Sequence, residues 1–486
     1  MRSFGSVLHQ IGALLLLFAL YFLLPAAAAL YFHEPAALRA FAAGALVTAL
    51  CGLLIRVATQ RFHSELKPRD GYLLVTLAWL ALAAIATLPL MLLLPGLSFT
   101  RACFETMSGL TTTGGTVLIG LDLLPHAVNL WRHALSWLGG LGIIVMAVAI
   151  LPLLGIGGMQ MYRADAPGSI KDAKLAPRIM KTVRLLWLVY GGLTALCAVA
   201  LRAAGMHWFD AICHAFSALS LGGFSTHDAN VGYFNSPLIE LVLVLFMLIA
   251  AMNFATHYLA ARKGDPGSYA RDPEAKWLLV WIGASWLGVS AHVWLSGVYA
   301  DLPSALRAVG FNLVSLATGS GLHTTDYGRW PVFAPMWMLF LSCVCASTGS
   351  TGGGIKMFRS LVLIKQSFRE MFTLVHPQAV APLRIAGQIV PDRVVYSVLA
   401  FIFLYFMIIV VLTFALLISG LDFISAFSAV VACINNAGPG LNRVGPGSNY
   451  GVLNDFQLWL CTAAMFLGRI EIFTCMVLFT PTFWRK

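Results

Sequence analysis

The sequence predicts an all-α integral membrane protein in which four pseudo-symmetric repeats surround one axis and two additional transmembrane helices precede them. Three observations predict this fold. Of the 486 residues, 59% are hydrophobic and only 10% are charged, and a water-soluble core cannot bury so much apolar surface. Segments of about 20 apolar residues, the length that a bilayer requires, occur about ten times. Short glycine-bearing loops recur roughly 100 residues apart, which indicates an internal repeat.

The ten apolar segments are the predicted membrane spans. The first is long enough to span the bilayer, so we expect it to be retained rather than removed as a signal peptide. The spans lie near residues 11–31, 38–58, 72–94, 134–156, 183–203, 237–260, 277–298, 333–358, 393–419 and 456–480. The predicted units are 1–66 for the two additional helices, then 67–162, 163–264, 265–375 and 376–486 for repeats one to four.

The charged residues indicate membrane orientation. The net charge is +11, but Lys and Arg cluster in alternate connectors and lack the aromatic interleaving of a nucleic-acid surface. By the positive-inside rule, these connectors and both termini are cytoplasmic. The basic stretches 162–181 and 365–393 either set topology alone or also dock a partner. The nine cysteines include no CxxC pair, so neither a disulfide framework nor a zinc site is indicated.

The connectors on the opposite side begin with short apolar helical stretches. Such stretches cannot cross a bilayer, and they fit re-entrant half-helices, which need protein or water around their exposed backbone. They are predicted near 101–112, 208–220, 304–317 and 422–435. A glycine-bearing loop follows each one, and the clearest of these loops is LTTTGGTV at Leu110 to Val117.

Four such loops meeting on one axis would form a cation filter around a pore. Backbone carbonyls can replace the water shell of a potassium ion without adding a trapping negative charge. Glycine permits positive φ and close approach of the backbone, and half-helices that point their C-terminal ends at the centre favour cations. Any single glycine of the set also fits an ordinary turn or a helix-packing contact. The proposed filter glycines are Gly114, Gly223, Gly321 and Gly438.

The register of loops two and three has alternatives. Gly222 or Gly319 could be the constricting glycine instead of Gly223 or Gly321. We favour Gly223 and Gly321 because each precedes a Thr and an Asp at the same distance.

A glycine-rich run interrupts the span near 333–358. It reads ASTGSTGGGIK from Ala346 to Lys356, and three consecutive glycines would unravel a helix in mid-membrane. A Walker loop requires Lys directly after Gly, whereas Ile355 separates Gly354 from Lys356 here. A packing notch is the simpler structural interpretation, and an intramembrane loop is the functional one.

The last span contains two ionisable residues, Arg469 and Glu471. An ionisable group at that depth costs a few kcal/mol and normally faces protein or water. The pair fits either a structural salt bridge or a functional group near a pore.

Several polar residues near the loops have two interpretations each. The carboxylates Glu105, Asp228 and Asp326 could concentrate cations at the outer mouth, or they could cap helices and hydrogen-bond loops. His214, His227 and His323 follow no metal-ligand spacing. They are therefore interpreted as polar histidines with hydrogen-bond partners.

The four loops TTTGGT, GGFSTHD, TGSGLHTTDY and NNAGPGL resemble the filter loops of the Trk/Ktr/HKT superfamily. The runs STGGGIK and LGRIEIF resemble two further motifs of its Trk-type bacterial potassium-uptake subunits, which also carry two extra N-terminal spans. The resemblance implies potassium as the substrate, the bacterial inner membrane as the location and a homodimer in the lipid bilayer. It also implies cytosolic regulatory subunits that bind NAD(H) or ATP/ADP, with no nucleotide or nucleic acid on this chain. Glycine rather than serine at position 114 is the family feature associated with potassium over sodium.

The resemblance also implies the site residues. In the family, the glycine-rich run blocks the permeation path below the filter until regulation moves it, and the arginine of the last span lies near the pore opposite this run. We hypothesise that Arg469 is an electrostatic barrier below the filter that also helps hold the run. The expected potassium-binding residues are Thr112, Thr113, Gly114, Leu221, Gly222, Gly223, Gly319, Ser320, Gly321, Asn436, Ala437 and Gly438. The expected gate residues are Ser347, Thr348, Gly349, Ser350, Thr351, Gly352, Gly353, Gly354, Lys356 and Arg469.

Two other function classes fit the sequence less well. A secondary transporter of another small solute, with a binding site at the membrane midplane, also uses repeats and broken helices, but two-fold inverted repeats would favour it. An intramembrane enzyme lacks support, because the sequence contains no HExxH motif, paired intramembrane aspartates or nucleophile and base arrangement.

Overall fold

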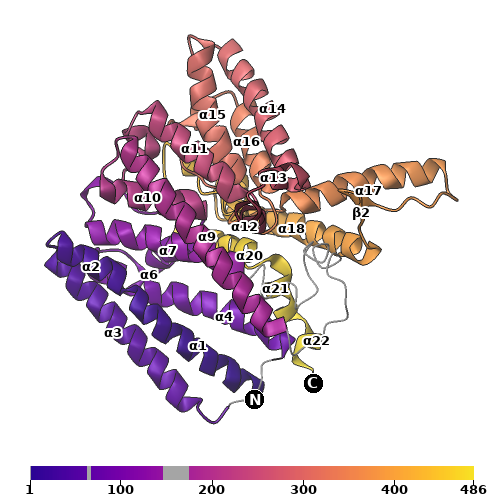
Figure 1. The fold of residues 1–486 in the computed structure, drawn as a ribbon. Helices are drawn as coiled ribbons and strands as arrows, with labels where there is room; N and C mark the ends of the chain where they lie inside the picture. The colour runs from indigo at the N-terminus through magenta and orange to yellow at the C-terminus, as the bar shows by residue number, and fades with distance from the viewer. Residues whose placement is uncertain (1, 63–66, 146–174, 486) are drawn as a thin grey trace.

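The computed structural model describes residues 2–62, 67–145 and 175–485, and helices make up most of it (Figure 1). The helices are α1 (Arg2–Tyr21), α2 (Leu23–Tyr31), α3 (Pro35–Ala58), α4 (Pro68–Ala86), α5 (Leu88–Leu93), α6 (Phe99–Leu110), α7 (His126–Val145), α9 (Leu175–Ala203), α10 (Trp208–Ser220), α11 (Pro237–Ala251), α12 (Phe254–Lys263), α13 (Gly267–Arg271), α14 (Pro273–Leu295), α15 (Leu302–Thr318), α16 (Phe333–Val344), α17 (Met357–Val375), α18 (Asp392–Ile418), α19 (Phe423–Ile434), α20 (Asp455–Arg469), α21 (Ile472–Met476) and α22 (Pro481–Trp484). The antiparallel strands β1 (Arg384–Ile385) and β2 (Gln388–Ile389) form one small hairpin.

The four predicted half-helices are confirmed as α6, α10, α15 and α19, with ends within two residues of the expected ones. Side chains cap the amide ends of three of them, since Ser98, Asp301 and Asp422 accept hydrogen bonds from backbone N–H groups in the first turn. All four are short, at 12, 13, 17 and 12 residues. They therefore end inside the protein instead of crossing it.

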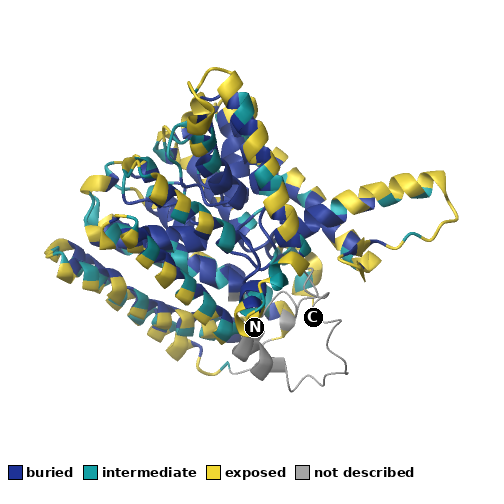
Figure 2. Cartoon of the chain, turned by 45° about the horizontal axis from the view of Figure 1, so that its top comes forward, coloured by how far each residue is buried: buried dark blue, intermediate teal, exposed yellow. Residues whose placement is uncertain are grey.

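The half-helices are held by their neighbours in a closed order. Helix α7 contacts α10, α11 contacts α15, α16 contacts α19, and α20 contacts α6. The helix that follows each loop thus packs against the half-helix of the next unit, and the last unit returns to the first. The buried residues concentrate in this central region (Figure 2).

The two N-terminal helical segments lie to one side of this assembly (Figure 1). α1 and α2 form a hairpin with α3, and the hairpin packs on α4 and α7. Its main anchor is the buried Trp131 of α7, whose ring contacts Phe18, Phe22 and Phe41. The Tyr21 hydroxyl also donates to the Ala134 carbonyl at 2.6 Å. Both chain termini lie at the same end of the molecule (Figures 1 and 2).

Six helical segments of the described chain are long and apolar enough to cross a membrane, or up to eight if each of two bent pairs counts as one span. The chain is a membrane protein with several apolar helices. The predicted total of ten spans remains a prediction. The predicted span 134–156 lies outside the described residues beyond residue 145, as do the repeat boundary at 162–163 and most of the basic stretch 162–181.

Three predicted spans differ from continuous helices. The span predicted at 237–260 bends by 98° between α11 and α12, and the span predicted at 456–480 bends by 108° between α20 and α21. The span predicted at 333–358 ends at Val344, and an irregular segment separates α16 from α17. The interruption of the third span agrees with the one that its glycine-rich run predicts. Hydropathy does not locate the two bends, because each bent pair is apolar enough as a whole to count as one span.

Helix α17 and the β-hairpin extend away from the central assembly, whereas α18 returns to it and packs on α19, α20 and α21 (Figure 1). Yellow, exposed residues cover much of this projection (Figure 2). Lys365 joins α17 to strand β1, because the Lys365 Nζ atom donates to the Arg384 carbonyl at 2.5 Å.

Candidate functional site: a glycine ring and the loop beneath it

All four half-helices end in the same backbone turn. One residue adopts a left-handed conformation, with φ between 54° and 81°, and the amide of the next residue donates to the carbonyl five positions earlier. This Schellman arrangement satisfies carbonyls that the helix end would otherwise leave unpaired. The left-handed residues are Thr112, Leu221, Gly319 and Asn436. The amide-to-carbonyl pairs are Thr113 to Ser108 at 2.8 Å, Gly222 to Ser217 at 2.9 Å, Ser320 to Ser315 at 2.8 Å and Ala437 to Ala432 at 2.9 Å.

A second left-handed residue follows two positions later, and it is glycine in every loop. The values of φ are 79° at Gly114, 66° at Gly223, 84° at Gly321 and 82° at Gly438. Gly222 lacks a positive φ, and Gly319 occupies the C-cap of α15. The backbone therefore aligns Gly223 and Gly321, the favoured pair of the two alternatives, with Gly114 and Gly438.

These four glycines, here called the glycine ring, pack against one another in cyclic order. A Cβ atom added to Gly114 would lie 2.5 Å from the Gly222 carbonyl oxygen, one on Gly321 would lie 2.5 Å from that of Ala437, and one on Gly438 would lie 2.8 Å from that of Thr113. A Cβ on Gly223 would collide with the carbonyl oxygen of Ser320. Each glycine thus faces the carbonyl that precedes the glycine of the next loop. Only glycine tolerates both this contact and a positive φ.

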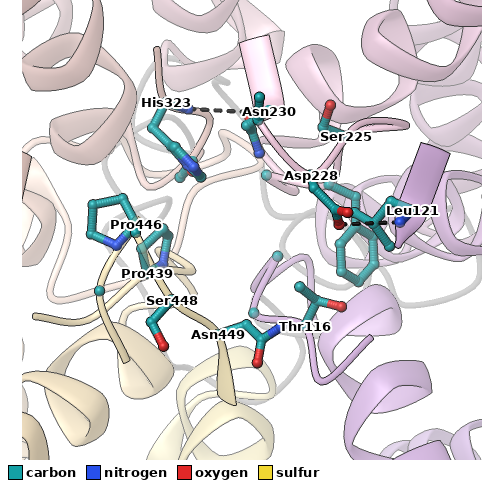
Figure 3. A pocket seen from close by; sticks show the side chains of 18 of the residues that line it. Thr116, Leu121, Ser225, Asp228, Asn230, His323, Pro439, Pro446, Ser448 and Asn449 are labelled. Carbon is teal, nitrogen blue, oxygen red and sulfur yellow. Dashed lines mark hydrogen bonds between the residues drawn. The ribbon is translucent and has the colours of Figure 1, made fainter. Parts of the chain in front are cut away.

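An open cavity of about 580 Å³ lies on the outer side of the glycine ring, and all four loops line it. Figure 3 shows side chains from the loops arranged around this opening, including Thr116, Asp228 and His323. Hydrogen bonds between loops shape it: Asp228 accepts from the Leu121 amide at 3.1 Å, and the His323 amide donates to Asn230 Oδ1 at 3.1 Å (Figure 3). The cavity leads from the outer surface to the ring.

In three of the four units, the side chain nine positions before the ring glycine forms a hydrogen bond with the loop of the same unit. His214 Nε2 lies 3.0 Å from Ser225 Oγ, and Asn312 both donates to and accepts from Thr324 at 2.9 and 3.1 Å. Glu105 accepts from the Val117 amide at 3.0 Å. The interpretation of Glu105 as a carboxylate that attracts cations at the mouth is therefore wrong, because it is 1% exposed and hydrogen-bonded to the loop.

Arg132 of α7 joins the first two loops. Its Nε donates to Glu105 at 2.8 Å, and its terminal nitrogens donate to Thr116 Oγ1 and to the Ser225 carbonyl, both at 3.2 Å. Its guanidinium also lies 4.3 Å from the centre of the Phe224 ring. The Glu105 and Arg132 side chains are 0% and 1% exposed. A buried pair of this kind aligns the two loops as long as both charges are present.

A second bridge joins the same loops at the outer surface. The His227 ring hydrogen-bonds to Asp122, its Nε2 lies 3.6 Å from Asp210, and it stacks on Tyr233. Burial disfavours the charged imidazolium, but the nearby carboxylates Asp210 and Asp122, the latter hydrogen-bonded to the ring, outweigh burial and raise the pKa of His227 above its ordinary value of 6.5. No cluster of three His, Cys, Asp or Glu side chains that could hold a metal occurs in the described segments.

We expect this bridge to stabilise the outer loops in mildly acidic solution and to be lost in alkaline solution. A raised pKa in the folded state contributes stability that is fully present below pH 6.5 and disappears as pH rises through the raised value. The melting temperature of the wild type should therefore exceed that of His227→Gln below pH 6.5, and the difference should vanish above the raised pKa. A difference that does not depend on pH would contradict this assignment.

On the inner side of the ring lies the irregular segment 346–356, here called the Gly-rich loop. The break between α11 and α12 supplies its hydrogen-bond partners: the amides of Ser347 and Thr351 donate to the carbonyls of Ala251 and Ala250 at 3.0 and 3.4 Å. The Phe254 amide donates in return to the Gly349 carbonyl at 3.1 Å. Further bonds run from the Thr348 amide to Glu274, from Ser350 Oγ to the Ser347 carbonyl and from Thr351 Oγ1 to the Leu219 carbonyl. The Gly-rich loop and the break between α11 and α12 thus provide hydrogen-bond partners for each other's exposed backbone groups at membrane depth.

The glycines of this loop press against the ends of the half-helices. A Cβ on Gly352 would lie 3.0 Å from the Thr318 carbonyl oxygen and 3.5 Å from the Leu221 side chain. A Cβ on Gly353 would overlap the Asn435 carbonyl oxygen. The loop therefore lies directly beneath the turns that precede the glycine ring in units two, three and four.

Arg469 links the Gly-rich loop to the first unit. Its guanidinium donates to the Thr351 carbonyl at 2.8 Å and to the Gly139 carbonyl of α7 at 3.0 Å, and the residue is 2% exposed. The Glu471 carboxylate pairs with Arg359 at 2.7 Å and not with Arg469. The interpretation of Arg469 and Glu471 as a structural salt bridge is therefore wrong, because the partner of Glu471 is Arg359.

The space beneath the ring is small and positively charged. Lys356, Arg359, Arg469 and Glu471 line a cavity of about 10 Å³ together with the glycines of the Gly-rich loop. That volume is at the lower limit for one water molecule. The cavity that these residues line is thus far smaller than the outer one, at about 10 Å³ against about 580 Å³.

Comparison with known proteins places the chain in a family. A family profile described as "TrkH: Cation transport protein" matches residues 37–486. The chain belongs to this family. Members of the Trk system are similar over their full length: the potassium uptake protein TrkH of Halomonas elongata is 42% identical over 485 residues, covering 100% of both chains, and TrkG of Escherichia coli K12 is 40% identical, covering 99% of this chain and 98% of TrkG. The crystal structure of the potassium transporter TrkH from Vibrio parahaemolyticus superimposes with a TM-score of 0.91 at 42% identity, covering 99% and 100% of the two chains.

Sequence reasoning missed Arg132, Asn312 and Tyr450. Arg132 is an ionisable residue inside an apolar stretch, which is a recognisable signal, but the predicted span began two residues later. Asn312 lies at the position equivalent to Glu105, so an alignment of the half-helices on their glycines could have found it. Tyr450 donates to the Gly438 carbonyl at 2.9 Å from further along the same connector between α19 and α20, and no local pattern indicates that contact.

Proposed function

We propose that this chain takes up potassium through the glycine ring, with the potassium ion as its substrate. The relatives are named as potassium uptake proteins of the Trk system and not as enzymes. The observation that carries the proposal is the closed cyclic contact of four left-handed glycines with the carbonyls of the neighbouring loops. Carbonyl rings of this kind can replace the hydration shell of a potassium ion, and four converging helix C-termini favour a cation.

The proposed filter comprises the three residues of each loop that end in the ring glycine. The four units of helix, half-helix, loop and helix then form pseudo-symmetric repeats around one pore. The closed order of contacts between each outgoing helix and the next half-helix supports this arrangement.

The Gly-rich loop is the proposed gate. Its glycines occupy the place directly below the filter turns, and Arg469 ties it to α7. The cluster of Lys356, Arg359 and Arg469 with the single carboxylate Glu471 would also repel a cation that leaves the ring. Withdrawal of the loop and Arg469 together would open the path.

Other assignments follow from the family. We propose the bacterial inner membrane as the location, cytoplasmic termini, a homodimer, and Trk-type regulatory subunits that bind NAD(H) or ATP/ADP and act on the Gly-rich loop. Both termini and the base of α17 to α18 are the regions where such a cytosolic partner would act. No nucleotide site is proposed on this chain.

The test is potassium uptake in cells that lack their own potassium transporters. Wild type should restore growth in low potassium, with rubidium as a competitor and sodium as a poor one. Gly114→Ser places a side chain at φ 79° and 2.5 Å from the Gly222 carbonyl oxygen, so uptake should fall about tenfold or admit sodium. Gly96→Ser is a matched control, because Gly96 also has a positive φ but has no atom within 4 Å of an added Cβ.

A secondary transporter of another small solute is the competing function. It would need a midplane site large enough for its solute, whereas the described space below the ring is about 10 Å³. Uptake that is indifferent to Gly114→Ser, or no uptake with a matched regulatory subunit, would favour that function.

A further inference from the structure

Asn436 has a fixed orientation at the inner end of the fourth filter loop. It is 1% exposed, and its Nδ2 donates to Thr113 Oγ1 and to the Met465 carbonyl, both at 3.0 Å. A carbonyl can only accept a hydrogen bond, so the nitrogen must face Met465 and the oxygen must face the other way. The amide cannot turn over without losing this contact.

The Oδ1 atom of Asn436 has no hydrogen-bond partner among the described residues, although it is buried. Burial of an amide oxygen without a partner is unfavourable. The neighbouring Asn435 differs, because its Oδ1 accepts from the Tyr405 hydroxyl at 2.5 Å and its Nδ2 donates to Ser342 Oγ at 3.0 Å. A buried amide oxygen without a protein partner is explained by a ligand that is bound to it, such as an ion.

Asn436 Oδ1 is aimed at the Gly-rich loop. A Cβ built on Gly353 would lie 2.9 Å from this oxygen. The same glycine lies close to the turn of the third loop, since a Cβ on Gly319 would lie 3.9 Å from the Gly353 nitrogen and 3.9 Å from the Asn436 carbonyl oxygen. The Oδ1 atom therefore faces Gly353, which occupies the position beside it just beneath the filter turns.

We propose that Asn436 Oδ1 is a side-chain ligand for the potassium ion at the inner end of the glycine ring, and that the ion and the Gly-rich loop compete for the space beside it. This inference rests on the proposed function. A neutral, fixed oxygen suits an alkali cation that has to leave again. Because the loop and the ion exclude each other there, potassium binding favours withdrawal of the loop.

A purely structural role for Asn436 makes a different prediction. In that case the residue would only tie the fourth loop to Thr113 of the first. Tyr405→Phe removes the hydroxyl that donates to Asn435 Oδ1 and so loosens the same turn, but it leaves Asn436 Oδ1 in place, whereas Asn436→Leu removes that oxygen at similar volume. The two variants therefore separate the structural role from the ligand.

The experiment measures the melting temperature of the purified full-length chain against increasing potassium, rubidium or sodium. Wild type should show potassium-dependent stabilisation. Asn436→Leu should weaken the apparent potassium affinity about tenfold and reduce the difference between potassium and sodium. Tyr405→Phe should lower the melting temperature without potassium but keep the potassium dependence and the ion ranking. If Asn436→Leu does not fold, Asn436→Ser takes its place, because its hydroxyl is too short to reach the position of Oδ1.

The outcomes separate this inference from the proposed function. Wild-type affinity and ion ranking in Asn436→Leu, or an equal loss in Tyr405→Phe, would overturn the assignment of Asn436 while leaving potassium uptake intact. Absence of both potassium-dependent stabilisation and potassium-selective uptake in wild type would instead overturn the proposed function.

Discussion

Gly353→Ala is expected to raise the basal flux of potassium about 5- to 150-fold in the absence of any regulatory subunit. The added methyl group would overlap the Asn435 carbonyl oxygen and lie 2.9 Å from Asn436 Oδ1. Both groups are held in place, so the loop must move. Overpacking of this kind costs about 1–3 kcal/mol. If the closed state loses that free energy, the equilibrium between the closed and the withdrawn loop shifts about 5- to 150-fold towards the withdrawn loop. Rubidium-tracer flux into proteoliposomes measures the change.

The matched control is Gly283→Ala on α14. Neither Gly353 nor Gly283 has a positive φ, and a Cβ on Gly283 would meet no atom within 4 Å. This control should leave the flux at the wild-type level. Wild-type flux in a folded Gly353→Ala variant would show that the Gly-rich loop does not close the path, and it would remove the basis for the proposed gate.

Arg132→Met is expected to destabilise the chain by about 3–5 kcal/mol, because it leaves the Glu105 carboxylate buried without its cation. The guanidinium also donates to Thr116 and Ser225, so the first two filter loops lose their common partner. The expected results are a large drop in the melting temperature of the purified chain and a loss of discrimination between potassium and sodium.

Two further variants test the cause. The double variant Glu105→Gln with Arg132→Met removes both charges and should recover part of the lost stability, as a double-mutant cycle would measure. Arg329→Met is the matched control, since Arg329 is 86% exposed in its pair with Asp326 and exposed pairs contribute little. If the double variant is no more stable than Arg132→Met alone, the ionic contact is not the cause.

The sequence was sufficient to predict where the half-helices lie in the chain. Short apolar stretches with Ser or Asp at their first turn and glycine beyond their end carry local signals, and local signals survive in the linear chain. The same holds for the choice of Gly223 and Gly321 in the backbone alignment, because the two glycines that share a spacing to the following Thr and Asp both lie two residues after the first left-handed residue of their loop.

The broken spans were not predictable from hydropathy. The bend after Ala251 exists because the Gly-rich loop donates to the freed carbonyls of α11, and that loop lies about 100 residues away in the chain. The same reason explains why the sequence left two interpretations of Glu105 open. A carboxylate at the start of a half-helix can face water or protein, and the choice depends on Arg132, which belongs to another helix.

The sequence by itself determined that this chain is a membrane protein, where its half-helices begin and end, and which glycines adopt left-handed conformations. Composition, periodicity and turn chemistry act within a few residues, so they can be read without a structure. Only the tertiary structure decided which carbonyl faces each glycine, what the Gly-rich loop covers, and that Asn436 presents an unpartnered oxygen to it. These contacts join residues from different units, and close packing alone brings them together.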